Sequence, residues 1–318
     1  MRRSTLFLVA PVLLLAGLLL ADVATAQPHP NGYAGTSTGG QVFLLSGSNT
    51  LTTVTAGTST GHGCVMDNLN TLLMVTNLDG SLYRVDPTTG TNVGSFATGL
   101  GSIYDIAVDH NGDYFVATST GTLFKVDQFA TVTTVATAVG ASTNGGMRLD
   151  IDTGELLIQS STGTDPLLLV SRNGSSITTL GSGQDARNGI AQDIRTGDVF
   201  IGSCCGDFTP SENIFVLMKG QTAASVWLAT ASAPVGVYSL QADRSSAAAP
   251  RLILGAFRPS STARGPGGFY TVDLGTKALG HVTTINASLY ETEVLYHRNV
   301  HSLATGRGQW QVGIRIPE

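Results

Sequence analysis

A short unit recurs along most of the chain, and it constrains the fold more than any other feature of the sequence. In each copy an apolar run ends at an aspartate, a tight turn follows, and a second apolar run comes after the turn. The clearest copies span 106–116, 149–158 and 192–201. With two looser copies, the repeated aspartates are Asp67, Asp109, Asp150, Asp193 and Asp243. The intervals between them are 42, 41, 43 and 50 residues, so the chain is built from similar units of this length.

The units have the chemistry of β-strands. Short runs rich in β-branched and aromatic residues lie between Gly, Asn and Asp, and no segment after the N-terminus shows sustained helical periodicity. A period of about 40–45 residues with four strands per unit is typical of β-propeller blades. We therefore predict an all-β, six-bladed β-propeller that forms a single domain over residues 27–318. Seven blades are the alternative, but at about 42 residues each they would use all 292 residues after position 26.

The two ends of the chain are predicted to close the ring together. The segments 41–45 and 51–56 resemble the outer two strands of a blade that lacks an inner pair. The segments 301–304 and 310–316 resemble an inner pair that lacks outer strands. A composite closing blade made from both termini would unite them and remove a free sheet edge.

The unit at 106–116 has the sequence IAVDHNGDYFV. This sequence and its copies resemble the six-bladed β-propellers of the NHL-repeat and TolB-like group, over nearly all of the chain after residue 26. The resemblance implies the fold. It implies no single activity, because the group includes ligand-binding scaffolds, protein-interaction modules, lactonases and lyases.

The N-terminus has the layout of a secretory signal peptide. Arg2 and Arg3 precede an apolar run at 6–20, and small residues follow at 24–26. This order of a positive region, an apolar region and a small-residue exit predicts cleavage after Ala26 and a secreted or periplasmic protein. An uncleaved membrane anchor is the alternative, although the run is shorter than the ~20 residues that span a bilayer. The formal charge of −5 provides no basic surface for nucleic acid.

Three cysteines remain in a compartment that permits disulfides. Cys204 and Cys205 are adjacent and follow the second strand of the fifth blade, whereas Cys64 lies on the inner strand of the second blade. A disulfide needs Cα atoms within about 7 Å, which this separation around the ring disfavours for Cys64. We predict a vicinal disulfide between Cys204 and Cys205. Two unpaired thiols are the alternative.

Polar side chains come just before most of the predicted inner strands. In a propeller these positions surround one mouth of the central channel, and polar groups that converge in a concave mouth are typical of a ligand site. The predicted ligand-binding residues are His62, Tyr104, Asp105, Asn144, Arg187, Asn188, Tyr238 and Asn299. Arg187 has a guanidinium fork that suits carboxylate or phosphate oxygens, or an internal pair with Asp105. The alternative is a water-filled channel whose polar lining binds no ligand.

Four further patterns favour structural interpretations. G-x-S-x-G occurs at 35–39 and 57–61, but a nucleophile elbow needs a strand before it and a helix after it, so turns are expected. The run at 150–155 resembles part of a calcium loop but lacks the remaining oxygen ligands, so a turn stabilised by Asp150 is expected. The loop at 257–268 is predicted between the second and third strands of the sixth blade. It is either a solvated insertion or a binding surface.

Two classes of function remain. No catalytic triad, metal cluster or cofactor motif is evident, which favours a non-enzymatic binding or protein-interaction module. Such a module would act as a monomer without a cofactor, and its partner would be a protein or a small molecule. The alternative is a metal-dependent enzyme of the lactonase or lyase type. The resemblance then implies a carboxylate-rich metal shell in the channel, for which Asp105, His62 and His301 are the candidates.

Overall fold

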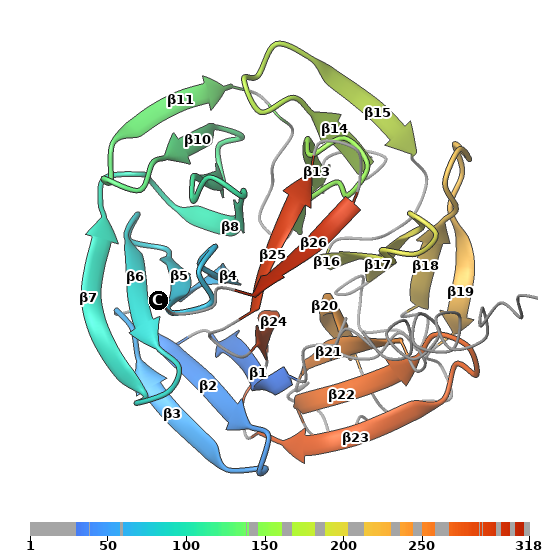
Figure 1. Ribbon diagram of the computed structural model, residues 1–318, viewed down its shortest axis with the longest axis horizontal. Coiled ribbons are helices and arrows are strands. Elements are labelled where there is room, and N and C mark those ends of the chain that lie inside the picture. The colour runs from blue at the N-terminus through green and yellow to red at the C-terminus, as the bar shows by residue number, and fades with distance from the viewer. Residues whose placement is uncertain are drawn as a thin grey trace, which may run out of the picture.

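Six four-stranded antiparallel sheets stand around a central axis and form a closed ring (Figure 1). The structure is a computed structural model, and it describes residues 30–37, 39–57, 60–137, 139, 146–160, 167–181, 188–202, 213–229, 236–243, 250–257, 267–285, 287, 289–296, 300–305 and 309–314. The ring confirms the six-bladed β-propeller and excludes the seven-bladed alternative. Within the described residues no helix is long and apolar enough to cross a membrane.

Five blades are continuous in sequence, and each runs from an inner to an outer strand. Blade 2 consists of β4 (Thr60–Met66), β5 (Leu73–Asn77), β6 (Leu82–Asp86) and β7 (Thr91–Ala97). Blade 3 consists of β8 (Ile103–Val108), β9 (Tyr114–Thr118), β10 (Leu123–Val126) and β11 (Val132–Ala136). Blade 4 consists of β12 (Met147–Leu149), β13 (Leu156–Gln159), β14 (Leu167–Val170) and β15 (Ile177–Gly181). Blade 5 consists of β16 (Asn188–Gln192), β17 (Val199–Gly202), β18 (Asn213–Leu217) and β19 (Ser225–Ala229). Blade 6 consists of β20 (Gly236–Asp243), β21 (Arg251–Phe257), β22 (Gly268–Asp273) and β23 (Leu279–Thr284).

Blade 1 is composite, but its strands differ from the prediction. Three strands come from the N-terminal side, namely β1 (Pro30–Ser37), β2 (Gln41–Ser46) and β3 (Leu51–Thr55). The inner strand is β24 (Glu291–Tyr296), which pairs with β1. The predicted outer pair at 41–45 and 51–56 is confirmed as β2 and β3. The predicted inner pair at 301–304 and 310–316 is wrong, because β24 and β1 occupy those two places.

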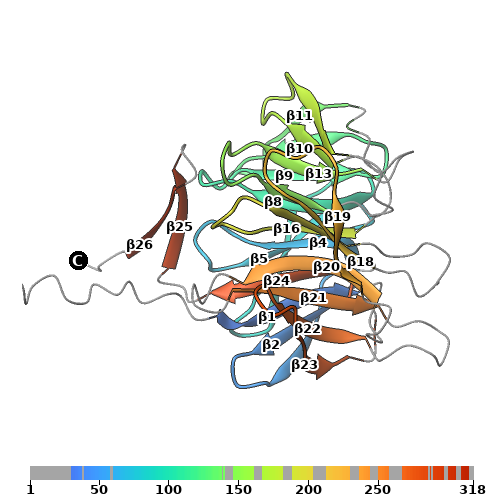
Figure 2. The same ribbon diagram turned by 90° about the vertical axis from the view of Figure 1, so that its right-hand side faces the viewer.

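The segments predicted as that inner pair form a separate hairpin. β25 (Val300–Thr305) and β26 (Gln309–Ile314) pair with each other in a two-stranded sheet. The hairpin lies across the centre of the ring in Figure 1 and stands apart from the ring in Figure 2. Because β25 comes just after β24, the hairpin belongs to the face of the ring where the inner strands end.

Aspartates stabilise the tight turns after the inner strands, as the repeat predicts. Asp109 accepts a hydrogen bond from the backbone N–H of Asn111 at 2.8 Å. Asp150 accepts bonds from the backbone N–H and the hydroxyl of Thr153 at 2.8 and 2.9 Å, and its second oxygen accepts one from the Gln192 amide at 2.9 Å. The expected structural turn at Asp150 is therefore confirmed by its donors.

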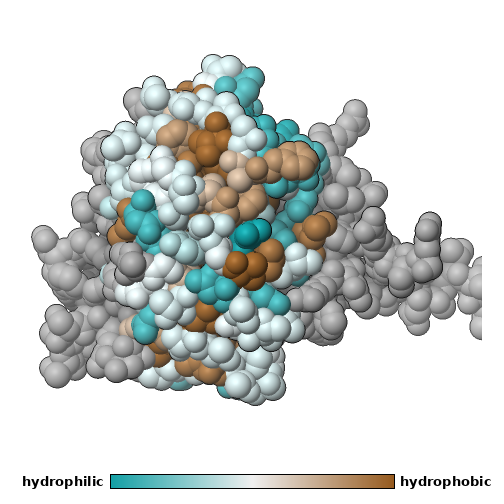
Figure 3. All heavy atoms as spheres, turned by 90° about the vertical axis from the view of Figure 1, so that its left-hand side faces the viewer, coloured by the Kyte–Doolittle hydropathy of each residue, from teal (hydrophilic) through white to brown (hydrophobic). Residues whose placement is uncertain are grey.

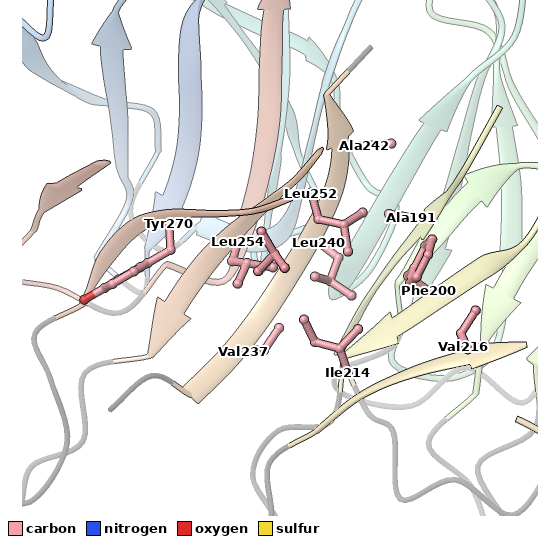
Figure 4. Close-up of a cluster of buried hydrophobic side chains, with 11 residues drawn as sticks. Ala191, Phe200, Ile214, Val216, Val237, Leu240, Ala242, Leu252, Leu254 and Tyr270 are labelled. Carbon is pink, nitrogen blue, oxygen red and sulfur yellow. The ribbon is translucent and has the colours of Figure 1, made fainter. Parts of the chain in front are cut away.

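Apolar side chains from neighbouring sheets fill the space between blades (Figure 4). Between blades 5 and 6 the cluster contains Ala191, Phe200, Ile214, Val216, Val237, Leu240, Ala242, Leu252, Leu254, Tyr270 and Val272. Full burial of one such aliphatic or aromatic side chain contributes about 1.5–3 kcal/mol. Blade-to-blade packing therefore stabilises the ring. Towards the solvent, Figure 3 shows brown apolar side chains scattered among polar ones, and the exposed Val93 and Val132 lie on outer strands.

Candidate functional site

The inner strands β4, β8, β12, β16, β20 and β24 surround the axis, and their first residues lie at one mouth of the ring. The pairing of four of these strands with the next strand shifts register close to a predicted site residue. The shifts fall between Thr60 and Cys64, between Ile103 and Asp105, between Asn188 and Ile190, and between Val237 and Ser239. Such irregularities bend a strand and redirect side chains, and they are common next to functional sites.

The predicted site residues divide into three groups. Five residues lie at the beginnings of four inner strands, as expected: His62 on β4, Tyr104 and Asp105 on β8, Asn188 on β16 and Tyr238 on β20. For His62, Asn188 and Tyr238 only the place along the strand is described. Asn144, Arg187 and Asn299 lie outside the described residues. Asn299 was predicted to precede the inner strand of the closing blade, and this is wrong because that strand, β24, ends at Tyr296.

Asp105 is buried at the inner edge of blade 3, with an exposed fraction of 1%. Its Oδ1 accepts a hydrogen bond from the backbone N–H of Ile106 at 2.7 Å. Its Oδ2 accepts one from the backbone N–H of Met147 on β12, the inner strand of the next blade. The Nη1 atom of Arg148 lies 4.0 Å from Oδ1. The carboxylate therefore joins blade 3 to blade 4 at the channel.

Glu293 holds a similar place on β24 in blade 1, with an exposed fraction of 6%. Its Oε1 accepts a hydrogen bond from the backbone N–H of the following residue, Val294, at 3.1 Å, as Asp105 does from Ile106. Both of its oxygens lie 3.0 Å from Nε2 of Gln241, which comes from β20 in blade 6. The two buried carboxylates thus belong to blades 1 and 3, with blade 2 between them.

Electrostatics couple these two carboxylates. Burial raises the pKa of Asp105 to about 7, and the charge of Glu293 acts in the same direction. The charge of Arg148 and the N–H groups of Ile106 and Met147 lower this pKa, but their effect is smaller than that of burial. A buried carboxylate favours its neutral form when it loses water and faces a like charge. Asp105 therefore gains or loses a proton near neutral pH.

Glycines occupy comparable places at three other inner strands, with Gly63 and Gly189 on β4 and β16 and Gly146 immediately before β12. A Cβ on Gly63 would lie 2.8 Å from Cα of Asp105, and one on Gly146 would lie 2.7 Å from the backbone nitrogen of Ile190. A Cβ on Gly189 would lie 2.5 Å from the backbone nitrogen of Leu240. The inner strands therefore approach too closely for a side chain at any of these three positions. The two buried carboxylates come from β8 and β24, whereas Arg148 and Gln241 come from β12 and β20.

Sequence reasoning found Asp105 and missed Glu293, Arg148 and Gln241. A signal for Glu293 was present, because the letters TEVL at 292–295 follow the order of YDIA at 104–107, with an acidic residue before two apolar ones. This strand was not predicted because Glu291 and Glu293 interrupt its apolar pattern. Arg148 and Gln241 interrupt apolar strands, and only their neighbours on other blades show why they are there.

The remaining sequence motifs either belong to assigned elements of the ring or lie outside the residues that the structure describes. Of the G-x-S-x-G run at 35–39, residues 35–37 belong to β1 and Gly39 lies in the turn to β2, so the expected turn is confirmed only at the end of the run. Neither run is followed by a helix among the described residues. Cys64 is buried on β4, as expected. Cys204 and Cys205 lie outside the described residues, between β17 and β18, and so do residues 258–266 between β21 and β22.

The part of the chain that the structure describes contains no group of three or more His, Cys, Asp and Glu side chains that could hold a metal ion. His301 lies in β25 of the separate hairpin and not in the ring.

Comparison with known proteins identifies the fold but finds no close relative in sequence. No protein-family model matches the chain, and no curated protein matches it. A structure of a nidogen/laminin complex aligns with a TM-score of 0.59 and 15% identity, over 83% of this chain and 98% of that one. A streptogramin B lyase aligns at 0.57 and 12%, over 85% and 88%. An inactive virginiamycin B lyase from Staphylococcus aureus, solved with quinupristin, aligns at 0.51 and 11%, over 67% and 70%.

These similarities define the class of protein. The chain is a six-bladed β-propeller, as its resemblance to the NHL-repeat and TolB-like group implied. At these identities the shared feature is the fold, which occurs in a nidogen/laminin complex in one case and in a lyase in another. Function must therefore be argued from the site.

Proposed function

We propose that the protein is an exported, non-enzymatic binding propeller. Its ligand would carry a positive charge or several hydrogen-bond donors, and would bind at the mouth where the inner strands begin. The observation that supports this proposal most is the burial of two carboxylates from different blades, Asp105 and Glu293, beside the mouth where the inner strands begin. Acidic groups with strongly shifted pKa values cluster at functional sites, and the pKa of Asp105 is raised to about 7, so this pair is a candidate functional feature.

The carboxylates act on such a ligand through their field. Their exposed fractions of 1% and 6% mean that water hardly reaches them from the mouth. Low-dielectric walls focus the potential of buried charges along a channel, and this attracts ions of opposite sign. Direct contacts would come from residues nearer the mouth, of which Tyr104 is half-buried and accessible. His62, Asn188 and Tyr238 begin three other inner strands around the same opening.

Export is proposed from the N-terminal sequence. Cleavage after Ala26 would leave the chain to begin three residues before β1, whose first residue is Pro30. Removal of the signal peptide therefore costs no strand of the ring.

The binding proposal is tested with small amines. We would record thermal unfolding of the mature protein with ethanolamine, putrescine and spermidine, and with glycerol as a neutral reference. A ligand that binds only the folded state raises its stability by RT ln(1 + [L]/Kd). We expect stabilisation by an amine, its loss in Glu293→Gln, and its retention in Asp127→Asn, which removes an equal charge from an exposed turn. Equal responses of both variants, or no response to any amine, would reject the proposal.

A metal-dependent lyase or lactonase is the second candidate. It is favoured by the pKa of about 7 for Asp105, because a group that titrates near the working pH suits general acid–base catalysis. Metal analysis of the purified mature protein separates the two candidates. A divalent metal in equimolar amount, together with turnover of a lactone or ester that Asp105→Asn abolishes, would favour the enzyme.

A further inference from the structure

A polar groove of about 480 Å³ lies between blades 3 and 4, away from the channel mouth discussed above. It is formed by the β8–β9 turn, the β12–β13 turn, the β14–β15 turn and adjacent parts of β9 and β10. These turns belong to the face of the ring where the inner strands end. The lining residues are Asp109, Asn111, Asp113, Phe115, Lys125, Thr153, Glu155, Ser171, Arg172 and Asn173. The volume lies within the range of about 300–1,000 Å³ that is usual for small-molecule sites.

One ion pair crosses the boundary between the two blades. Nη1 of Arg172, from blade 4, lies 3.1 Å from Oδ2 of Asp109, from blade 3. The Asp109 side chain is 3% exposed and is held by its own turn, whereas the Arg172 side chain is 39% exposed. The buried partner therefore anchors the guanidinium, which has further N–H groups to present to the groove.

A second ion pair belongs to blade 3 alone. Nζ of Lys125 on β10 lies 3.1 Å from Oδ2 of Asp113, which precedes β9. Both side chains are partly exposed, at 36% and 20%. An ammonium group has three donors and a carboxylate has about four lone-pair positions, so this pair also retains hydrogen-bonding capacity.

The remaining lining residues complement these pairs. Glu155 contributes a half-buried carboxylate that makes no ion pair with any residue in the described ranges. Phe115 is buried and provides apolar surface at the groove. Asn111, Asn173 and Ser171 add neutral polar groups. The five charged groups are three acids and two bases, so they nearly cancel.

We propose that this groove is a second ligand site, and that it binds a neutral saccharide. Each ion pair places a donor beside an acceptor at 3.1 Å, which is close to the separation of the oxygens in a vicinal diol. Two neighbouring hydroxyl groups can then bond one to the base and one to the acid, and hydrogen bonds to charged groups are the stronger ones. The near-zero charge of the groove suits a neutral ligand. Internal pairing holds the four charged side chains in place before binding.

Blade 5 contributes to a third ion pair, which lies outside the groove. Lys219 of that blade lies 2.8 Å from Asp152 of blade 4, so this pair also crosses a blade boundary. Its side chains are more exposed, at 58% and 39%, and neither residue lines the groove. An exposed pair of this kind contributes little by itself. It is therefore a matched control for the two pairs in the groove.

The experiment uses the mature protein and saturation-transfer NMR followed by titration calorimetry. The probes are glucose, galactose, mannose and N-acetylglucosamine, with glucuronate as an anionic reference. We expect at least one neutral sugar to bind, and binding to weaken about tenfold or more in Lys125→Met and in Arg172→Met, because a charge-assisted hydrogen bond is lost. Lys219→Met and Glu293→Gln should leave the affinity within about twofold, which separates this site from the channel.

Several results would overturn the proposal. These are failure of all four neutral sugars to bind, binding of glucuronate alone, or equal effects of Lys125→Met and Lys219→Met. Arg172→Met leaves Asp109 buried without its partner and can lower stability. Lys125→Met avoids this problem because Asp113 is more exposed, so its result decides the question if the first variant does not fold.

Discussion

Asp105 shows how a single side chain can make the whole ring sensitive to pH. Its carboxylate is buried, and its pKa is raised from 3.8 to about 7 chiefly by desolvation. The folded state therefore holds a proton between these two pH values that the unfolded state releases. By linkage, this group lowers stability progressively as pH rises from about 4 to about 7, and its penalty is complete above that range.

We therefore predict that Asp105→Asn flattens the pH dependence of unfolding. Wild-type stability should fall between pH 4.5 and 7.5 by on the order of 1 kcal/mol or more, since one pKa unit corresponds to about 1.4 kcal/mol. The variant should lose most of this slope, even if the amide bonds less well to Met147. Urea unfolding at several pH values measures it. A slope unchanged in Asp105→Asn would assign the effect to other groups.

The vicinal disulfide between Cys204 and Cys205 remains a prediction from the sequence, because both residues lie outside the described ranges. Cys64 is buried on β4 of blade 2, whereas the pair follows β17 of blade 5. We expect the pair to be oxidised to each other in the exported protein. Peptide mass spectrometry without reduction should show a loss of two hydrogens within one peptide. A cross-link from Cys64 to either residue would contradict this pairing.

At the residue scale, sequence reasoning was limited by which contacts are local. Asp109 and Asp150 were recognisable because each accepts hydrogen bonds from its own turn. Glu293 and Gln241 are 52 residues apart and meet only when blades 1 and 6 come together. Arg148 similarly approaches Asp105 from the next blade. Such pairs leave no pattern within one repeat.

Among the elements, β24 has a larger role in closing the ring than its amino-acid composition indicates. It is the inner strand of blade 1, it pairs with β1, and Val294 and Leu295 are buried in two different clusters. Glu291 and Glu293 break the apolar pattern that marks the other inner strands. β1 was hidden in a similar way, because Gly32 and Gly35 look like turn residues, although Ala34 and Thr36 are fully buried.

Two truncations test this assignment. A chain that ends at residue 299 lacks only the β25–β26 hairpin, and we expect its melting temperature to stay within about 2 °C of the full mature protein, the size of a change below 1 kcal/mol. A chain that ends at residue 290 also lacks β24 and should lose cooperative unfolding, because blades 2 and 6 are no longer joined through it. Circular dichroism during heating measures both. Equal melting of the two chains would contradict the role of β24.

Repeat arithmetic predicted the number and order of blades because every blade repeats the same local chemistry. It could not predict which strands close the ring. That choice depends on the pairing of Gly32–Thr36 with Glu291–Leu295. These segments are far apart in the sequence, so no short sequence pattern contains both. The sequence predicts the hairpin at 300–314 as part of the ring because its alternating pattern is equally suitable for a strand in either place.

For the whole molecule, the joint between blades 6 and 1 is reinforced by a polar contact. Nη2 of Arg251 on β21 donates a hydrogen bond to the hydroxyl of Tyr33 on β1 at 3.0 Å. Nε of the same guanidinium lies 2.6 Å from the buried Asp243. Tyr33 also packs against Phe269, with ring centroids 6.0 Å apart. This network ties the last complete blade to the first.

We predict that Tyr33→Phe lowers the free energy of unfolding by about 1–2 kcal/mol, because a hydrogen bond to a charged group is removed while the ring packing is kept. Urea unfolding measures the change. The control is Tyr83→Phe in blade 2, which removes the same hydroxyl from a half-buried site away from the joint. A larger loss in the control would show that the Arg251 contact contributes little.

The long separation between β1 and β24 has a consequence for the newly made chain. Residues 37 and 291 are 254 positions apart, and at about 5–20 residues per second a ribosome needs about 13–50 s to make that stretch. Throughout this time β1 can pair with β2, but its other edge, which later pairs with β24, stays unpaired. Such edges can pair with other chains. A cell that makes this protein must keep residues 30–55 from pairing with a neighbouring chain until β24 has been made, so the risk of aggregation is concentrated in this interval.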